Sequence, residues 1–253
     1  MTKFKEWCEE TETSISTHTL RLLVAAPAKR THAIEVVANA VPEYYAAPSR
    51  IAGILKKLGK PEAAKFVEEK LPTLPSLKSG ELGEILCNAY VTEETTFKLG
   101  IKRLRWKDHR NMSMRGEDVL AFSLDPKTGY LKILKAEVKS RASMPTAVIE
   151  EARAALSSNK ELPSPHAISF VADRLDEEGD TKLRDVLDTA QLKDGIKASQ
   201  VTHMLFTFSG SNPSNLLKTN LSAYTGAVSQ QYVALQVESH QAFIQSVFDA
   251  VGK

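Results

Sequence analysis

The sequence predicts an α/β domain in which helices flank a mixed β-sheet, preceded by a mainly helical N-terminal extension. Helical and strand-like segments alternate after residue 79, in the order helix, three strands, helix, strand, with further elements behind them. The stretch LPTLPSLKSG, residues 71–80, is rich in proline and serine and is the best candidate for a boundary. We therefore expect a helical region over residues 1–75 and an α/β domain over residues 76–253.

The N-terminal region contains one strand-like run and several helical pieces. We expect a strand over residues 19–24 and a helix over KPEAAKFVEEKL, residues 60–71. Pro61 suits the first turn of that helix, because its missing N–H would have no partner there. This region would either dock a partner protein or cover one face of the sheet.

The α/β domain is expected to begin with a helix over GELGEILCNAY, with Ser79 as its N-cap. Its apolar residues recur at helical spacing and define one buried face: Leu82, Ile85, Leu86 and Ala89. The remaining helical patterns cover residues 144–159, 176–191 and 239–251. Strands are expected over residues 96–106, 166–172, 201–208 and 231–237, with a hairpin over residues 117–141.

Composition indicates an ordinary soluble globular protein. Of the 253 residues, 42% are apolar and 25% are charged, and the net charge of +2 is too small to indicate a nucleic-acid partner by itself. Only Cys8 and Cys87 are present, so a disulfide framework is unexpected and the reducing cytoplasm fits. No apolar run approaches the roughly 20 residues that a membrane span needs. We expect a cytoplasmic protein without a membrane segment.

The segment over residues 117–141 predicts a hairpin from its turn chemistry. In DPKTG, Pro126 presets φ and Gly129 can adopt the left-handed conformation. If PKTG forms a four-residue loop, Asp125 pairs with Tyr130. This pairing defines the register of both strands.

Continuing that register without a bulge places Asp118 directly opposite Glu137, and alternation puts Lys139 on the same face. Most of that face is apolar: Leu120, Phe122, Leu124, Leu131 and Ile133. Two opposed carboxylates destabilise a sheet unless a metal, a lysine or both supply positive charge. Mg²⁺ is the simplest source of this positive charge, because it prefers oxygen ligands and can polarise a phosphodiester while supplying hydroxide.

With Asp118 followed after a turn by Glu137-Val138-Lys139, the sequence resembles the PD-(D/E)xK nuclease superfamily. The resemblance covers residues 79–175 and implies a restriction-endonuclease-like αβββαβ core. It also implies that Asp118 and Glu137 bind Mg²⁺ or Mn²⁺ and that Lys139 assists the attacking water.

The same resemblance implies a third acid on the first helix of the core. In GELGEIL this acid would be Glu84, with Glu81 as the alternative, because neither lies cleanly on the apolar face. The proline of the superfamily name is absent, since Glu117 precedes Asp118, but that position varies in the superfamily.

A narrower resemblance rests on the combination of SGELGEIL, MRGEDVLAF and LKAEVKSR in a chain of this size. On these motifs the chain is similar to HamA, the nuclease family of the Hachiman anti-phage defence system. This resemblance implies DNA degradation and a helicase partner, HamB, that holds the nuclease inactive until DNA damage or invasion is sensed. The sequence contains no P-loop motif, so helicase activity must come from another chain.

The densest basic cluster, KRLRWKDHR, covers residues 102–110 and leads towards Asp118. Its cations suit phosphate contacts, and Trp106 or His109 could stack or hydrogen-bond on nucleic acid. A solvated loop beside a core tryptophan is the other interpretation. The candidate DNA-binding residues are Arg105, Lys107, His109, Arg110, Arg115 and Arg141.

Other chemistries and functions are less well supported by the sequence. The six histidines show no zinc-ligand spacing, and there is no G-x-S-x-G motif. A catalytically inactive nuclease-fold module that binds nucleic acid or a partner protein is the main alternative. A restriction-type enzyme would need a second DNA-reading domain, for which no segment is evident. Duplex and single-stranded substrates, one metal or two, and the oligomeric state all stay open.

Overall fold

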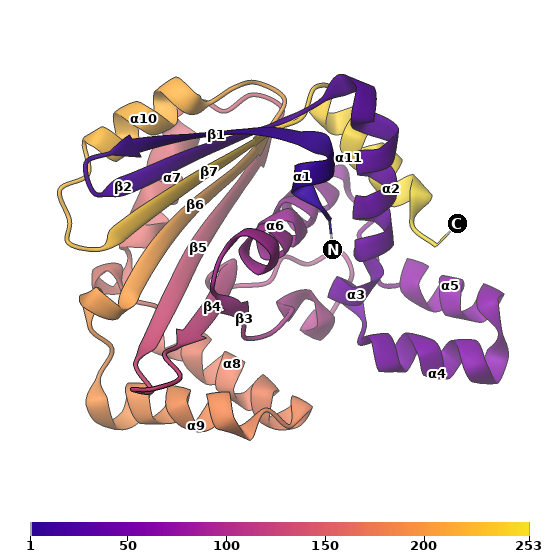
Figure 1. The fold of residues 1–253 in the computed structure, drawn as a ribbon. Helices are drawn as coiled ribbons and strands as arrows, with labels where there is room; N and C mark the ends of the chain where they lie inside the picture. Colours follow the sequence, from indigo (N-terminus) through magenta and orange to yellow (C-terminus); the bar gives the residue numbers. More distant parts are fainter. Residues whose placement is uncertain (1, 253) are drawn as a thin grey trace.

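A seven-stranded sheet runs through the centre of the molecule in the order β1-β2-β7-β6-β5-β4-β3 (Figure 1). The computed structural model describes residues 2–252. The strands are β1 (Cys8–Ile15), β2 (His18–Ala25), β3 (Lys98–Leu99), β4 (Val119–Leu124), β5 (Leu131–Arg141), β6 (Val201–Ser209) and β7 (Ser229–Gln236). The inner pairs β2–β7, β7–β6 and β6–β5 are parallel, and the outer pairs are antiparallel. The prediction of a mixed sheet flanked by helices is confirmed.

Helices cover both faces of this sheet and bury an apolar cluster on each. One face packs against α1 (Phe4–Trp7), α2 (Arg30–Ala40), α6 (Pro75–Glu94) and α11 (His240–Ala250). The other packs against α7 (Thr146–Ser157) and α10 (Ser214–Ser222) and, near β4, against α8 (Pro165–Glu178) and α9 (Thr181–Thr189). The remaining helices are α3 (Pro42–Tyr45), α4 (Pro48–Leu58) and α5 (Lys60–Glu68), and α4 and α5 form a pair that projects from the body (Figure 1).

The N-terminal region is helical between residues 30 and 68, but it also supplies two strands to the sheet. The strand expected over residues 19–24 is confirmed as part of β2, which pairs with β7. The edge strand β1 was not predicted, because its polar residues are exposed and show no apolar face. The sheet therefore extends across the sequence boundary at residues 71–80.

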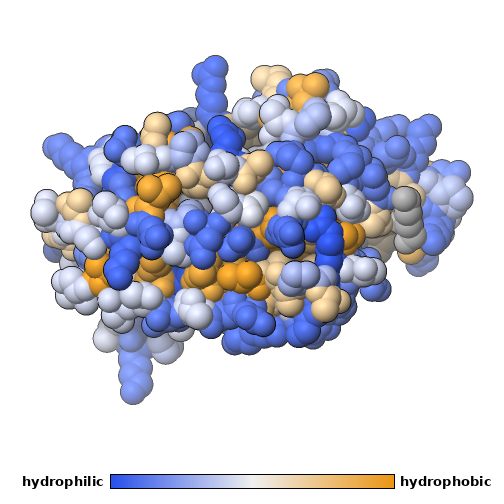
Figure 2. Space-filling model, turned by 90° about the horizontal axis from the view of Figure 1, so that it is seen from above, coloured by the Kyte–Doolittle hydropathy of each residue, from blue (hydrophilic) through white to orange (hydrophobic). Residues whose placement is uncertain are grey.

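The upper side of the molecule, in the orientation of Figure 1, is predominantly hydrophilic, with hydrophobic side chains in small groups (Figure 2). The exposed polar residues of β1 belong to the upper edge of the sheet in Figure 1. Within residues 2–252, no helix is both long enough and apolar enough to cross a membrane.

The predicted register of the hairpin between β4 and β5 is confirmed. Val119 pairs with Ala136, so Asp118, the residue before β4, falls opposite Glu137. Alternate residues of β4 and β5 face the α6 side and the α8 side of the sheet, and both sets are apolar over most of their length. Asp118, Glu137 and Lys139 therefore lie at the end of the hairpin away from the turn.

The turn of this hairpin forms as its sequence predicts. The Asp125 N–H donates to the Tyr130 carbonyl at 3.0 Å, and the Gly129 N–H donates to the Asp125 carbonyl at 2.9 Å. Gly129 has φ of 68°, in the left-handed region that favours glycine. The Asp125 carboxylate also accepts from the Lys127 and Thr128 N–H groups. This network fixes the loop length and hence the register.

Residues 166–172 lie within α8, so the strand predicted there is wrong. The Ser164 hydroxyl caps this helix by accepting from the Ala167 N–H at 3.2 Å, and Pro165 occupies the first turn. The buried residues recur at helical spacing: Ile168, Val171, Ala172 and Leu175. The Ser-Pro start signal should have outweighed the short apolar run.

The other strand prediction that fails covers residues 96–106. Only β3 is extended there, and a 3₁₀ turn follows at Arg103–Trp106. Arg103 and the following Lys107 pair with buried acids on α6 instead of alternating across a sheet.

Two predicted helix limits also differ from the structure. The helix expected over residues 176–191 is divided, because α8 ends at Glu178 and is capped by Gly179, whose φ is 83°, before α9 begins. Ser79 is not an N-cap, since α6 already begins at Pro75, and its Oγ lies 2.8 Å from Ser140 Oγ on β5. Apart from residues at their ends, the remaining helices and strands are confirmed: α5, α7, α11, β6 and β7.

The helix α6 approaches β5 closely at Gly83, beside Glu84. A Cβ at position 83 would lie 3.2 Å from Ser140 Cβ and 3.2 Å from Val138 Cγ1. Since protein interiors are close-packed, a larger side chain there forces the helix and strand apart. Gly83 therefore sets the distance at which Glu84 reaches the end of the sheet.

Replacing Gly83 by valine is expected to lower the free energy of unfolding by about 2 kcal/mol, because the side chain overpacks this contact. Gly80→Ala in the same helix is the matched control, since a Cβ there meets nothing within 4 Å. The control is expected to raise stability by up to about 1 kcal/mol. Urea unfolding followed by circular dichroism measures both, and equal effects would contradict the close contact.

Candidate functional site

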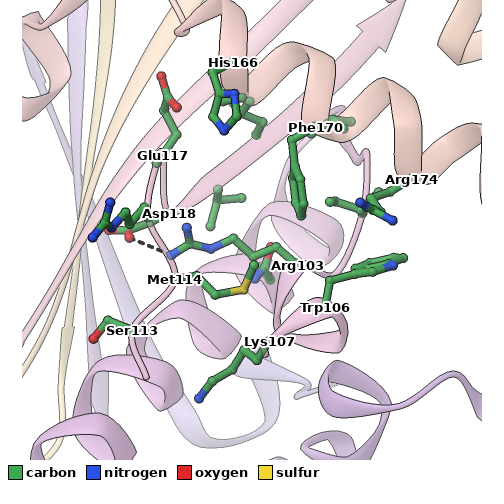
Figure 3. A pocket seen from close by; sticks show the side chains of 18 of the residues that line it. Arg103, Trp106, Lys107, Ser113, Met114, Glu117, Asp118, His166, Phe170 and Arg174 are labelled. Atoms are coloured by element: carbon green, nitrogen blue, oxygen red, sulfur yellow. Dashed lines mark hydrogen bonds and ion pairs between the residues drawn. The ribbon is translucent and has the colours of Figure 1, made fainter. Parts of the chain in front are cut away.

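Arg103 joins two of the predicted acids, Glu84 on α6 and Asp118 at the start of β4. Its Nε donates to Glu84 Oε1 at 2.8 Å, and its Nη2 donates to Glu84 Oε2 at 2.9 Å. The same Nη2 donates to Asp118 Oδ1 at 3.0 Å (Figure 3). Asp118 Oδ2 accepts from the Val138 N–H at 2.8 Å. All four oxygens of these two carboxylates are therefore hydrogen-bonded within the chain.

Glu137 and Lys139 form a second pair on the face of β5 that packs against α7. Lys139 Nζ lies 3.0 Å from Glu137 Oε1 and 2.8 Å from Glu151 Oε1 on α7. The Glu137 and Lys139 side chains are 17% and 14% exposed, whereas that of Glu151 is 67% exposed. The lysine is thus held beside Glu137 at a site that is largely shielded from water.

The electrostatics of the two pairs are coupled through Asp118. Burial raises the pKa of Glu84 to about 7, although Arg103 stabilises the charged carboxylate and so lowers it. The negative charge of Asp118 adds to the rise. Burial also raises the pKa of Glu137 to about 7, with Asp118 adding to the rise and Lys139 opposing it. Partial burial disfavours the charge of Lys139, but its hydrogen bonds to Glu151 and Glu137 outweigh this and raise its pKa.

The raised pKa of Glu137 predicts a specific pH dependence of stability. The folded state holds a proton on Glu137 up to about pH 7, whereas the unfolded state releases it near the ordinary value of 4.5. Glu137 therefore destabilises the fold progressively as pH rises from about 4.5 through 7. Relative to the wild type, Glu137→Gln is expected to gain stability between pH 5 and pH 8.

Denaturant unfolding in EDTA at several pH values measures this difference. Comparing the two proteins cancels the opposite contribution of His203 and His240, whose pKa values burial lowers to about 4. A constant difference between wild type and Glu137→Gln across this range would contradict the raised pKa.

The predicted acids match a divalent metal in donor chemistry but are not gathered around one point. Across residues 2–252, no three His, Cys, Asp or Glu side chains form a group that could hold a metal ion. Carboxylate oxygens are nevertheless the ligands that Mg²⁺ and Mn²⁺ prefer. Glu84 and Asp118 are already arranged around a positive charge, which Arg103 supplies. A metal bound by these two acids must therefore replace contacts that Arg103 makes.

Glu81, the alternative helix acid, has different partners. Its Oε2 accepts from the Tyr45 hydroxyl at 2.7 Å, and its Oε1 is paired with Lys107. Burial raises the pKa of Glu81, although Lys107 and Tyr45 oppose the shift. Glu84, and not Glu81, is the residue that the structure links to Asp118.

The six predicted DNA-binding side chains fall into two groups. Three make contacts inside the chain: Arg105 with Glu178 and the Glu43 carbonyl, Lys107 with Glu81, and Arg110 with the Leu71 carbonyl. Three are exposed: His109, Arg115 and Arg141. Arg141 ends β5 two residues beyond Lys139, and Arg115 lies three residues before Asp118, so both lie close in sequence to the acids.

Sequence reasoning missed Arg103 as a site residue, although it lies in the basic cluster. The sequence feature that could have identified it is the similar spacing of two acids on α6 and two cations in the segment that follows. Glu81 and Glu84 are three residues apart on α6, and Arg103 and Lys107 are four residues apart in the next segment. Because buried carboxylates require partners, these four residues could have been paired in advance.

Comparison with known proteins extends over almost the whole chain. A family model described as HamA matches residues 2–251. Hachiman protein HamA from Bacillus cereus is 27% identical over 254 residues, which cover 97% of this chain and 89% of that protein. The similarity therefore includes the N-terminal strands as well as the hairpin with its acids.

Proposed function

Because the chain belongs to the HamA family, we propose that it is a Mg²⁺- or Mn²⁺-dependent DNA nuclease with a restriction-endonuclease-like core. The observation that carries this proposal is the hairpin register, which opposes Asp118 to Glu137 and places Lys139 beside them. The relative from Bacillus cereus is named as a Hachiman protein. We place this chain in the same kind of anti-phage defence system, as the component that degrades DNA.

The acids have the metal-binding role in this proposal. Asp118 and Glu137, with Glu84 from α6, would hold the ion. When bound, such an ion polarises the phosphodiester and lowers the pKa of a water molecule. Arg103 now donates to oxygens of both Asp118 and Glu84, so an ion held by these acids would take the place of some of these hydrogen bonds. The raised pKa values of Glu84 and Glu137 mean that loading also releases protons.

Lys139 has the positioning role. Its ammonium lies 3.0 Å from Glu137 Oε1 and stays charged. A fixed positive charge there orients the attacking water through its hydrogen-bond donors and offsets negative charge that develops on the phosphate. Lys139 is held in place from the other side by Glu151.

A separate helicase chain of the HamB kind is the proposed regulatory partner. The present sequence lacks a P-loop, so it supplies no nucleoside-triphosphate motor of its own. In this proposal the helicase holds the nuclease silent and releases it when damaged or invading DNA is sensed.

One observation favours a second candidate function, a nuclease-fold module that binds nucleic acid or a partner without cleaving. Arg103 saturates the oxygens of Glu84, and all four oxygens of the Glu84–Asp118 pair are occupied. In a catalytically silent module this ion pair would be a permanent structural contact. Tight DNA binding without metal-dependent turnover would favour that function.

Plasmid degradation by the purified chain tests the nuclease proposal. The wild type is expected to degrade DNA in Mg²⁺ and to stop in EDTA. The double variant with Glu137→Ala and Lys139→Ala is expected to be inactive in both. Cleavage that survives the chelator and the double variant would refute the proposal.

A further inference from the structure

A cavity of about 660 Å³ opens beside Asp118, between the segment at residues 101–120 and helix α8 (Figure 3). This is within the size range of small-molecule sites. Its lining combines two aromatic rings with four cationic side chains: Trp106, Phe170, Arg103, Lys107, Arg115 and Arg174. The position next to a proposed phosphodiester-cleaving acid makes the cavity a candidate for part of the nucleic-acid substrate.

Helix α8 presents one face to this cavity. His166, Phe170 and Arg174 are spaced four residues apart and therefore project from the same side of the helix. The Arg174 guanidinium lies 5.2 Å from the centre of the Phe170 ring. Phe170 points into the cavity from α8, and Trp106 enters it from the 3₁₀ turn on the opposite wall (Figure 3). An aromatic ring backed by a guanidinium plane is a platform on which a nucleobase stacks.

Two of the cationic side chains that line the cavity have hydrogen-bonding capacity that the chain does not use. Arg103 Nη1 and Arg174 Nε are buried side-chain nitrogens with no hydrogen-bond partner in the part of the chain that the structure describes. Buried donors are rarely left unpaired in proteins, and each such case requires an explanation. Ring nitrogens and carbonyl oxygens of a base, or phosphate oxygens, would supply acceptors to these arginines.

Most of the charged side chains around the cavity are paired: Arg103 with Glu84 and Asp118, Lys107 with Glu81, and Arg174 with Glu177. Asp118 is bound by Arg103, and Glu117 accepts from the Ser164 N–H and hydroxyl at the start of α8. Arg115 is exposed and forms no ion pair within residues 2–252. The combination of a stacking surface, two unused arginine donors and the unpaired cation of Arg115 matches a nucleotide better than an apolar or cationic molecule.

We propose that this cavity binds one unpaired nucleobase of the DNA strand that is cleaved at Asp118. A base in a duplex is stacked and paired, so entry requires a single-stranded segment, a frayed end or a flipped nucleotide. The inference rests on the proposed nuclease function and specifies its substrate: DNA with at least one unpaired base next to the scissile phosphate. Phe170 and Trp106 are the stacking residues of this site.

Binding without cleavage tests the proposal. The Glu137→Gln protein in EDTA is titrated with a fluorescent single-stranded 12-mer, with the same strand carrying a run of abasic sites, and with a blunt duplex. Phe170→Ala is expected to weaken binding of the intact strand roughly 5- to 100-fold, the range for loss of one base–aromatic stack. Binding of the abasic strand is expected to change less than about twofold, because backbone contacts remain.

Two further variants guard against loss of folding. Phe170→Trp keeps a stacking ring and is expected to restore the preference for the intact strand. Tyr130→Ala removes an aromatic ring that is 43% exposed at the distant turn of the hairpin and is expected to leave binding unchanged. Equal effects of Phe170→Ala on the intact and abasic strands, or no effect on either, would overturn the proposal. Since this assay needs neither metal nor turnover, it fails independently of the plasmid test of nuclease activity.

Discussion

Replacing Arg103 by glutamine is expected to lower the free energy of unfolding by at least about 3 kcal/mol in EDTA, because it leaves Glu84 buried without a compensating charge. For a chain of this length, that corresponds to a fall in Tm of roughly 6–12 °C. The loss should be smaller at pH 6 than at pH 8, since Glu84, whose pKa is already about 7, can protonate when Arg103 is gone. Differential scanning fluorimetry at the two pH values measures it.

Mn²⁺ is expected to reverse part of this loss, because removal of Arg103 frees oxygens of Glu84 and Asp118 for a cation. At a metal concentration 100 times its dissociation constant, binding adds about 2.7 kcal/mol of stability. Arg105→Gln is the matched control from the same 3₁₀ turn. Its partner Glu178 is 39% exposed and its other hydrogen bond goes to the Glu43 carbonyl, so its removal leaves no buried carboxylate without a cation. It should therefore cost clearly less than the loss of Arg103, about 1–2 kcal/mol, and should show no metal rescue. An Arg103 variant as stable as this control would contradict the account of the buried pair.

Replacing Lys139 by alanine is expected to reduce the rate of DNA cleavage by about 100- to 1000-fold, the range for loss of one preorganised charged donor at a reacting centre. Metal binding should persist, since Asp118, Glu137 and Glu84 are retained. Cleavage of a labelled DNA under single-turnover conditions, with enzyme in excess, measures the chemical step.

Glu151→Gln is the control for this prediction. Glu151 holds Lys139 from the solvent side, but its side chain is 67% exposed, so the pair is screened by water. Its loss should change the rate by less than about tenfold. A Lys139→Ala protein that cleaves as fast as Glu151→Gln would show that the lysine has only a structural role, as an ion-pair contact between β5 and α7.

The hairpin could be predicted closely because its determinants are local. Proline, aspartate and glycine define one turn, and the length of its loop fixes which residues of the two strands pair. Both features are visible in residues 117–141 alone. The opposition of Asp118 and Glu137 follows from them without tertiary information.

The wrong predictions of secondary structure fall where tertiary contacts, and not the local sequence, determine whether a segment forms a helix or a strand. The run at residues 166–172 has the length and composition of a buried strand, yet it forms a helix that closes over β4. Residues 96–106 look extended, but Arg103 in this segment and Lys107 just after it pair with the buried acids Glu84 and Glu81 on α6. In both places the outcome depends on elements that lie far away in the sequence.

The residues of the candidate site likewise divide into those that the local sequence identifies and those that only tertiary packing brings together. Asp118, Glu137 and Lys139 belong to one hairpin and could be selected together. Arg103 comes from a separate turn, and the α8 side chains beside the cavity belong to an element whose type was misassigned. Their roles depend on the packing of α6, the 3₁₀ turn and α8 around the start of β4, which no local pattern specifies.

Titration of the protein with Mn²⁺, followed by electron paramagnetic resonance of the free ion, tests most directly whether the opposed acids hold a metal. The wild type is expected to bind Mn²⁺, and Asp118→Asn and Glu137→Gln are each expected to weaken binding by at least about tenfold, because each removes a carboxylate ligand. Glu151→Gln should bind as the wild type does. Equal affinity in all four proteins, or no binding even when Arg103 is replaced by glutamine, would contradict the account.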